Sequence, residues 1–369
     1  MDLDTTPTPS ARSQEFEAYS RRVEFSGSGK EFFSIWIVNI VLTLLTLGIY
    51  SAWAKVRTYR YFYGHTQLDG HRFDYLASPI QILKGRILAF ILFVIYMFCT
   101  QFVPILGVLA VFGLLFLMPW MVNQGMRFNM RMSRYRNVRF AFKGNYGDAF
   151  LNFIVLPIVS VFTLYLLLPY VLKRIDKYLH SEISYADKPI TVNTKGGEYY
   201  LAVILAYVAC AIVGVIVMTI AGVFGLSLQT MMLDPEGFEQ SLTTISAVAL
   251  IILFVVGYTA IFAVYMGVYQ THVRNHLLNS SEIEGIASFK SDLRIVDYTL
   301  LTLTNALAVL CTLGLAIPWA KVRTAKMLCR ATEITFLCDP QTLTDAQGEQ
   351  NSSFAEEAAD FFDVDLSLG

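Results

Sequence analysis

The sequence is poor in charged residues: Asp, Glu, Lys and Arg make up only 15% of its 369 residues, whereas 55% are hydrophobic. Soluble globular domains have about 25% charged residues, so this deficit indicates that much of the chain is embedded in a lipid bilayer. A mean hydropathy of +0.51 agrees with that reading. The formal net charge of −1 offers no electrostatic basis for binding nucleic acid. We therefore expect a membrane protein with no nucleic-acid partner.

Paired cysteines and enzyme motifs are also missing. The cysteines lack the spacing of a disulfide scaffold or a CxxC metal site: Cys99, Cys210, Cys311, Cys329 and Cys338. Walker A, GxSxG and HExxH patterns do not occur. His272 and His276 could share one helix face, but no convincing third ligand lies near them. We expect no metal and no cofactor, and the sequence leans against an enzyme.

Long uncharged runs are abundant, and a membrane-crossing helix needs about 20 apolar residues. One run is too long for a single helix, and Pro104 and Gly107 divide it. The pattern predicts an all-α, polytopic membrane domain over residues 32–338, between a flexible polar N-terminal tail at 1–31 and an acidic disordered tail at 339–369. Its apolar segments are expected at about 33–53, 87–103, 105–122, 150–171, 200–224, 242–268 and 298–319.

The chain also contains an internal repeat. Residues 46–58 read TLGIYSAWAKVRT and residues 312–324 read TLGLAIPWAKVRT, so nine of thirteen positions agree. A fainter middle copy lies at 169–174, preceded by Phe142-x-Gly144, which matches Phe25-x-Gly27. The predicted order is a short basic-flanked segment, a hairpin, a short segment, a hairpin and a short segment. Such duplication is common in transporters but is not confined to them.

The first copy also carries a family resemblance. The run from Phe25-x-Gly27 through Phe33, Trp36 and Asn39 to TLGIYSAWAKVRTYRYFYGHTQLDG resembles the YjgN-like family of bacterial inner-membrane proteins. The resemblance extends over roughly residues 23–337. It implies a multi-pass protein of the bacterial cytoplasmic (inner) membrane, and it supplies no catalytic or binding residues because the family has none assigned.

Two topologies remain open from the charge distribution. Seven full crossings with the WAKVR segments inside leave 16 Lys and Arg residues inside and 12 outside, a poor fit to the positive-inside rule. If the three short segments are re-entrant, all 28 face the cytoplasm and the acidic loop 225–241 is periplasmic. The length of the short segments favours ordinary crossings. In both cases the WAKVR segments and the C-terminal tail are predicted to be cytoplasmic.

Two kinds of polar residue are candidate functional residues. Asn39 and Asn305 occupy matching positions in apolar segments, where a carboxamide needs partners inside the protein; it makes either an interhelical hydrogen bond or a substrate or ion site. Aromatic and cationic residues of the WAKVR segments are predicted to contact anionic lipid headgroups. These are Trp53, Lys55, Arg57, Arg60, Trp319, Lys321, Arg323 and Lys326.

The sequence supports three classes of function. Transport or permeation of a small solute or lipid through a repeat-built helical bundle comes first, because of the repeats and the intramembrane Asn residues. The alternative is a non-catalytic membrane organiser that binds anionic lipid or a partner protein. An intramembrane enzyme is third and has no motif. Protein partners and oligomeric state stay open.

Overall fold

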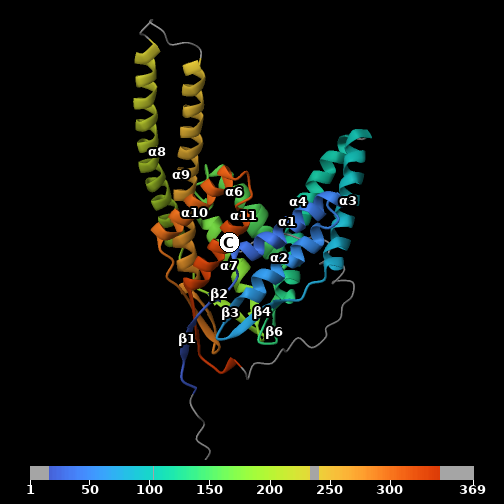
Figure 1. The fold of residues 1–369 in the computed structure, drawn as a ribbon. Helices are drawn as coiled ribbons and strands as arrows, with labels where there is room; N and C mark the ends of the chain where they lie inside the picture. The colour runs from blue at the N-terminus through green and yellow to red at the C-terminus, as the bar shows by residue number, and fades with distance from the viewer. Residues whose placement is uncertain (1–15, 103, 233–240, 341–369) are drawn as a thin grey trace, which may run out of the picture.

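In the computed structural model, which describes residues 16–102, 104–232 and 241–340, helical hairpins stand on one antiparallel sheet of eleven strands (Figure 1). The expectation of an all-α fold is therefore wrong. The strands are β1 (Tyr19–Arg22), β2 (Glu24–Phe25), β3 (Thr66–Leu68), β4 (His71–Tyr75), β5 (Ser133–Tyr135), β6 (Val138–Phe142), β7 (Ile183–Tyr185), β8 (Lys188–Val192), β9 (Ser281–Ile283), β10 (Ala287–Ser291) and β11 (Thr332–Phe336).

Five repeated units build the molecule, and each is a helical hairpin flanked by two strands. Three hairpins are short and two are long. The short ones are α1 (Gly29–Leu45) with α2 (Ser51–His65), α5 (Tyr146–Phe150), η1 (Leu151–Val155) and α6 (Leu156–Phe162) with α7 (Leu168–Ser181), and α10 (Ile295–Cys311) with α11 (Ile317–Arg330). The long ones are α3 (Pro79–Phe102) with α4 (Pro104–Met132), and α8 (Gly196–Met232) with α9 (Ser241–Asn279).

One backbone hydrogen bond recurs at the base of every unit, where the chain enters and leaves the hairpin. An N–H group just after the first strand donates to a carbonyl oxygen just before the second strand. The five pairs are Ser26 to His65, Leu76 to Met132, Lys143 to Glu182, Asn193 to Ser280, and Asp292 to Ala331. The units are therefore structural copies of one another, although the sequence reveals only the three short ones.

Tight turns connect the units. Arg136 and Asn137 between β5 and β6, like Ala186 and Asp187 between β7 and β8, all have positive φ angles. Two consecutive positive φ values define a type I′ turn, whose twist matches that of the paired strands. The Asp69–Gly70 turn between β3 and β4 is of the same kind.

The sheet is nearly closed into a ring. It runs β1-β11-β10-β9-β8-β7-β6-β5-β4-β3-β2, and only Val23 separates β1 from β2 in the chain. Because β1 pairs with β11 and β2 pairs with β3, residues 19–25 join the two ends of the ring. These strands lie within the stretch 1–31 that we expected to be a polar tail; residues 1–15 of that tail, and 341–369 of the C-terminal tail, lie outside the described residues.

Apolar side chains from seven strands meet in one buried cluster, so this cluster fills the ring. Tyr135 and Tyr185 lie within it, and their hydroxyls donate to the carbonyl oxygens of Leu68 (3.0 Å) and Tyr135 (3.2 Å). The other fully buried members are Val23, Leu68, Val138, Ile283, Ile286, Ala287 and Phe336.

The strands escaped the sequence analysis for a physical reason. None is longer than five residues, and each is stabilised by neighbours that come from other units. Such pairing leaves little local signal beside largely apolar helices such as α1, of 17 residues, and α9, of 39 residues. The Asp69–Gly70 pair is typical of a turn, but a turn alone does not identify the strands on either side of it.

Both long hairpins rise on the same side of the sheet, with the short hairpins between them (Figure 1). Four helical segments among the described residues are long and apolar enough to cross a membrane: Pro79–Gln101, Ile105–Met132, Gly196–Val223 and Val248–Asn279. Each of the three short apolar stretches instead turns back at its middle, and its two halves pack together within one hairpin.

Candidate membrane-interface site

Each short hairpin turns at a threonine that ends its first helix and whose hydroxyl binds the backbone at the start of the second helix. Thr46 Oγ1 accepts a hydrogen bond from the N–H of Tyr50 (2.9 Å), and Thr312 Oγ1 accepts one from the N–H of Ala316 (2.9 Å). Thr163 does the same in the middle hairpin at 3.3 Å. These bonds satisfy helix N-terminal donors that have no partner within the helix. The repeated Thr-Leu pair is thus a turn signal, and it reverses the chain halfway through each apolar stretch.

The leucine after each threonine projects from the tip of its hairpin. Leu47, Leu164 and Leu313 adopt positive φ angles near 50° and are 95%, 85% and 94% exposed, respectively. Their neighbours Leu45 and Leu166 are each 75% exposed. Apolar surface of this extent is unfavourable in water, so the three tips are suited to contact with lipid.

The two candidate asparagines join the helices of their own hairpins. Nδ2 of Asn39 donates to the carbonyl oxygen of Ala54 (3.4 Å), and Nδ2 of Asn305 donates to that of Ala320 (3.3 Å). Oδ1 of Asn305 accepts a hydrogen bond from Arg323 (2.9 Å). Each amide therefore stabilises a hairpin. Of the two roles proposed for these asparagines, the observed contacts are interhelical hydrogen bonds.

In the first hairpin the WAKVR residues lie along α2, below its tip. Trp53 is partly buried and packs on the buried cluster around Ala52 and Val56. The Lys55 ammonium lies 5.4 Å from the centre of the Tyr59 ring, and Arg57 donates to the Tyr50 hydroxyl (2.9 Å). Arg60 reaches farther down and donates to the carbonyl oxygen of Ala77 (2.9 Å).

In the last hairpin the same residues lie along α11. The Trp319 ring is 4.7 Å from that of Phe33 in α1, so this tryptophan joins the last unit to the first. Gly29 makes that approach possible, because a Cβ there would lie 2.4 Å from the indole ring. Lys321 and Arg323 are exposed, and Lys326 is half-buried in a hollow at the base of the hairpin. The predicted residues thus form two matching groups on two helices.

The sequence analysis missed a tyrosine that closes the base of two hairpins. The Tyr61 hydroxyl accepts from the N–H of Ser28 (2.8 Å) and donates to its carbonyl oxygen (2.9 Å). Tyr178 donates to the carbonyl oxygen of Asn145 (2.9 Å) in the middle hairpin. Burial raises the pKa of Tyr61 to about 12, and that of Tyr178 likewise, so both stay protonated donors.

The repeated Phe-x-Gly motif explains how these hydroxyls reach the backbone. A Cβ at Gly27 would lie 2.9 Å from the Tyr61 hydroxyl, and one at Gly144 would lie even closer to that of Tyr178. Only glycine leaves this space. The motif was visible in the sequence, and its matching tyrosines at equal spacing were the signal that could have identified the contact.

The described residues contain no group of three His, Cys, Asp or Glu side chains that could hold a metal ion. His272 Nε2 lies 2.9 Å from a carboxylate oxygen of Glu198, and His276 Nε2 accepts a hydrogen bond from the N–H of Lys195. These two histidines therefore connect α9 with the start of α8.

A family model described as "Bacterial protein of unknown function (DUF898)" matches residues 20–361, nearly the whole chain. The chain belongs to this family. Inner membrane protein YjgN of Escherichia coli K12 is 33% identical to it over 129 residues, which are 35% of this chain and 32% of that protein. Inner membrane protein YjgN of Salmonella typhimurium LT2 is 31% identical over 152 residues, 41% of this chain and 38% of that protein.

The aligned part thus spans about a third of the curated relatives' length. The family resemblance inferred from the WAKVR motif is confirmed, and with four apolar helices of crossing length the chain is an inner-membrane protein. No solved structure matches it.

Proposed function

We propose that this protein is a non-catalytic organiser of the cytoplasmic leaflet, which it enters with three short hairpins and whose anionic lipids it binds. The observation that carries the proposal is the pairing of exposed apolar tips, at Leu47, Leu164 and Leu313, with cationic side chains on the same hairpins. Tips of this kind favour the acyl region, and each cation near an anionic surface contributes about 1 kcal/mol.

The orientation follows from charge. The stretches 87–126 and 196–273, which belong to the long hairpins, contain no Lys or Arg. In the described chain these cations lie on or beside the strands, on the short hairpins and at the sheet ends of the long helices. Positive charge is retained on the cytoplasmic side of the membrane. We therefore place the sheet in the cytoplasm, with the long hairpins crossing the bilayer and the short ones turning back within it.

Transport, the function that the sequence ranked first, has weaker support. Asn39 and Asn305 donate hydrogen bonds from Nδ2 within their own hairpins, and the ring of strands is filled with apolar side chains. A polar pathway would instead need amide groups that face an open, hydrated space.

The lipid composition around the protein tests the proposal. Extraction in polymer nanodiscs, followed by lipid analysis, should show more phosphatidylglycerol and cardiolipin beside the protein than in the whole membrane. The variant carrying Lys55→Gln, Arg57→Gln, Lys321→Gln and Arg323→Gln should lose at least half of this enrichment.

A matched control removes four exposed cations from the strands instead: Arg72→Gln, Arg139→Gln, Lys188→Gln and Lys290→Gln. It should keep the enrichment of the unaltered protein. A lipid shell with the composition of the whole membrane, or an equal loss in both variants, contradicts the proposal.

A further inference from the structure

A hollow of about 540 Å³ lies at the base of the last short hairpin, where α10 begins and α11 ends. Five of its lining residues are cationic and two are acidic; the acidic ones are Asp292 and Asp297, and the cations are Arg22, Arg294, Arg323, Lys326 and Arg330. We propose that this hollow binds a phosphate group, in the first instance that of an anionic lipid headgroup. The inference rests on the proposed placement of the sheet side against the cytoplasmic leaflet.

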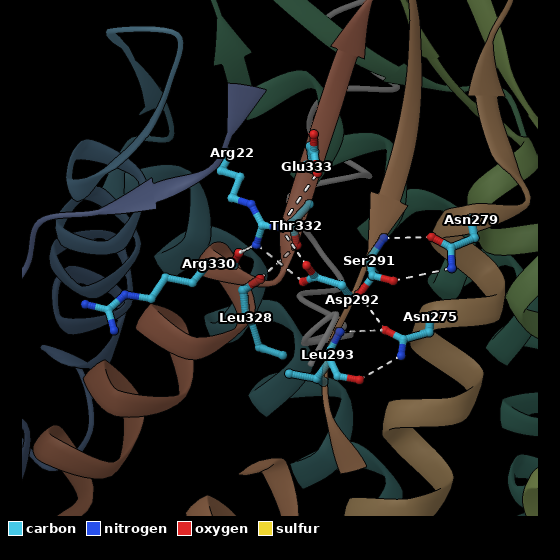
Figure 2. A network of polar contacts seen from close by, with 10 residues as sticks. All are labelled: Arg22, Asn275, Asn279, Ser291, Asp292, Leu293, Leu328, Arg330, Thr332 and Glu333. Carbon is cyan, nitrogen blue, oxygen red and sulfur yellow. Dashed lines mark hydrogen bonds and ion pairs between the residues drawn. The ribbon is translucent and has the colours of Figure 1, made fainter. Parts of the chain in front are cut away.

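The acidic residues are already engaged, which leaves the hollow positively charged. The Asp292 carboxylate accepts hydrogen bonds from Nη2 (2.6 Å) and Nη1 (3.4 Å) of Arg22, and a carboxylate oxygen of Asp297 lies 3.8 Å from Nη1 of Arg294. Lys326 and Arg330, in contrast, have no hydrogen-bond or ion-pair partner for their side chains within the described ranges. Figure 2 shows the Arg330 guanidinium extending away from the network around Asp292. These two cations are available to an anion.

The wall of the hollow is fixed before any ligand arrives. Asn275 in α9 accepts from the N–H of Leu293 (3.1 Å) and donates to its carbonyl oxygen (2.8 Å), as Figure 2 shows. Asn279 makes the corresponding pair with Ser291, and Arg22 donates to the carbonyl oxygen of Arg330 (2.7 Å). A site held in place in this way loses little conformational entropy on binding.

The other two short hairpins serve as internal comparisons. At the same distances in sequence from the tip threonine, they carry small neutral residues: Ser28 and Asn145 in place of Arg294, and Gly64 and Ser181 in place of Arg330. The hydrogen bond from a tyrosine hydroxyl to the backbone is also absent from the last hairpin. Met327 occupies the position that corresponds to Tyr61, and Leu293 the position that corresponds to Gly27. The last unit has therefore exchanged a closed polar base for an open one with two added cations.

The position of the hollow suits a headgroup. Arg323 and Lys326 follow Trp319 along α11 by about one and two turns, on the way from the lipid-exposed tip to the sheet. Phosphate groups lie at this level of a bilayer, just outside the acyl region that the tips are suited to enter. A dissolved phosphate ester has the same chemistry, so the experiment needs to separate the two sources.

The test uses the full-length protein purified into phosphatidylcholine nanodiscs. One arm adds phosphatidylglycerol to the nanodiscs and counts retained lipid by native mass spectrometry. The other titrates sn-glycerol 3-phosphate in solution by calorimetry. The test variant, Arg294→Ser with Arg330→Ser, introduces residues that the sister hairpins already carry, and Ser at position 294 restores an N-cap like that of Ser28.

The matched control, Lys143→Ser with Lys177→Ser, removes two exposed cations from the middle hairpin. We expect at least a tenfold loss of phosphatidylglycerol retention in the test variant and no loss in the control. Loss of both ligands identifies a phosphate site open to water, and loss of lipid alone identifies a headgroup site; both support the inference. Equal retention in the two variants, or no binding by the unaltered protein, overturns it.

Two further results keep the interpretation unambiguous. If the double variant fails to fold, Lys326→Gln replaces it in the same comparison, with Lys177→Gln as its control. If the hollow binds phosphatidylglycerol while the surrounding lipid shell shows no anionic enrichment, this inference stands and the proposed function fails. The reverse result leaves the proposed function standing and removes the inference.

Discussion

At the scale of single residues, Asp69 carries the densest set of charged contacts in the described turns. Its carboxylate accepts hydrogen bonds from Tyr19 (3.0 Å), Arg21 (3.1 Å) and Arg136 (2.5 Å). These residues come from β1 and from the neighbouring turn, so Asp69 holds residues 19–22 against the turns of two units. Partial burial opposes its ionisation, but the hydrogen bonds from Arg21 and Tyr19 and the nearby positive charges outweigh it and lower the pKa of Asp69 below its ordinary 3.8.

Replacing this carboxylate should weaken the fold at neutral pH. A depressed pKa means that ionised Asp69 stabilises the folded state above the unfolded pKa, and that this contribution is lost as pH falls through the folded pKa. Asp69→Asn should therefore be less stable by about 1 kcal/mol at pH 7. The difference from the unaltered protein should shrink steadily below about pH 4. Thermal unfolding in detergent between pH 3 and 7 measures it.

Asp187→Asn is the control for this prediction. Asp187 lies in an equivalent turn with a φ of 63°, and its carboxylate makes no ion pair with any described residue. Asparagine tolerates the left-handed conformation at both positions, so neither change strains its turn. Equal effects of the two substitutions at pH 7 would show that the charge of Asp69 contributes nothing.

At the scale of elements, α9 and α10 approach each other closely at Gly267. A Cβ at Gly267 would lie 1.9 Å from Thr299 Oγ1 and 2.8 Å from the backbone Cα of Thr299. Backbone atoms cannot move aside as a flexible side chain can. Gly267 therefore sets the distance at which the last short hairpin packs against the long one.

Adding one methyl group there should push the two helices apart. We expect Gly267→Ala to destabilise the protein by about 1–3 kcal/mol, the usual cost of overpacking. Gly214→Ala in α8 is the matched control, because nothing lies within 4 Å of a Cβ at Gly214. The control should be neutral or slightly stabilising, since alanine favours a helix more than glycine does. Unfolding temperatures in detergent compare the two, and a neutral Gly267→Ala would refute the close approach.

At the scale of the whole molecule, the proposed orientation makes three separate statements about accessibility. The turn at Asp187 should be cytoplasmic, the tip at Leu164 should be in lipid, and the connection at Gly237, which lies outside the described residues, should be periplasmic. Single cysteines at these positions, in a chain without its five native cysteines, can be treated with a membrane-impermeant maleimide.

Each position has its own expected pattern. Gly237→Cys should be labelled in intact cells, Asp187→Cys only after the inner membrane is permeabilised, and Leu164→Cys under neither condition. Labelling of Leu164→Cys in intact cells would show that the tip reaches the periplasm and would contradict a tip that lies in lipid. Labelling of Asp187→Cys in intact cells would place this turn in the periplasm, as an ordinary crossing of the middle segment requires, and would contradict the proposed orientation.

The sequence by itself determined the membrane location, the family and the existence of the repeat. These features depend on composition and on identity between local segments, both of which are independent of how the chain folds. The WAKVR copies at Trp53 and Trp319 and the apolar runs of α8 and α9 were readable for that reason.

Only the tertiary structure decided the sheet, the turning of the short segments and the hollow at the base of α11. Each depends on partners far apart in the chain: β1 pairs with β11, and Arg22 lies beside Asp292. A strand of two to five residues has no stability alone, because its hydrogen bonds come from neighbouring units. All five units were therefore recognisable as copies only once their strands had joined in one nearly closed ring.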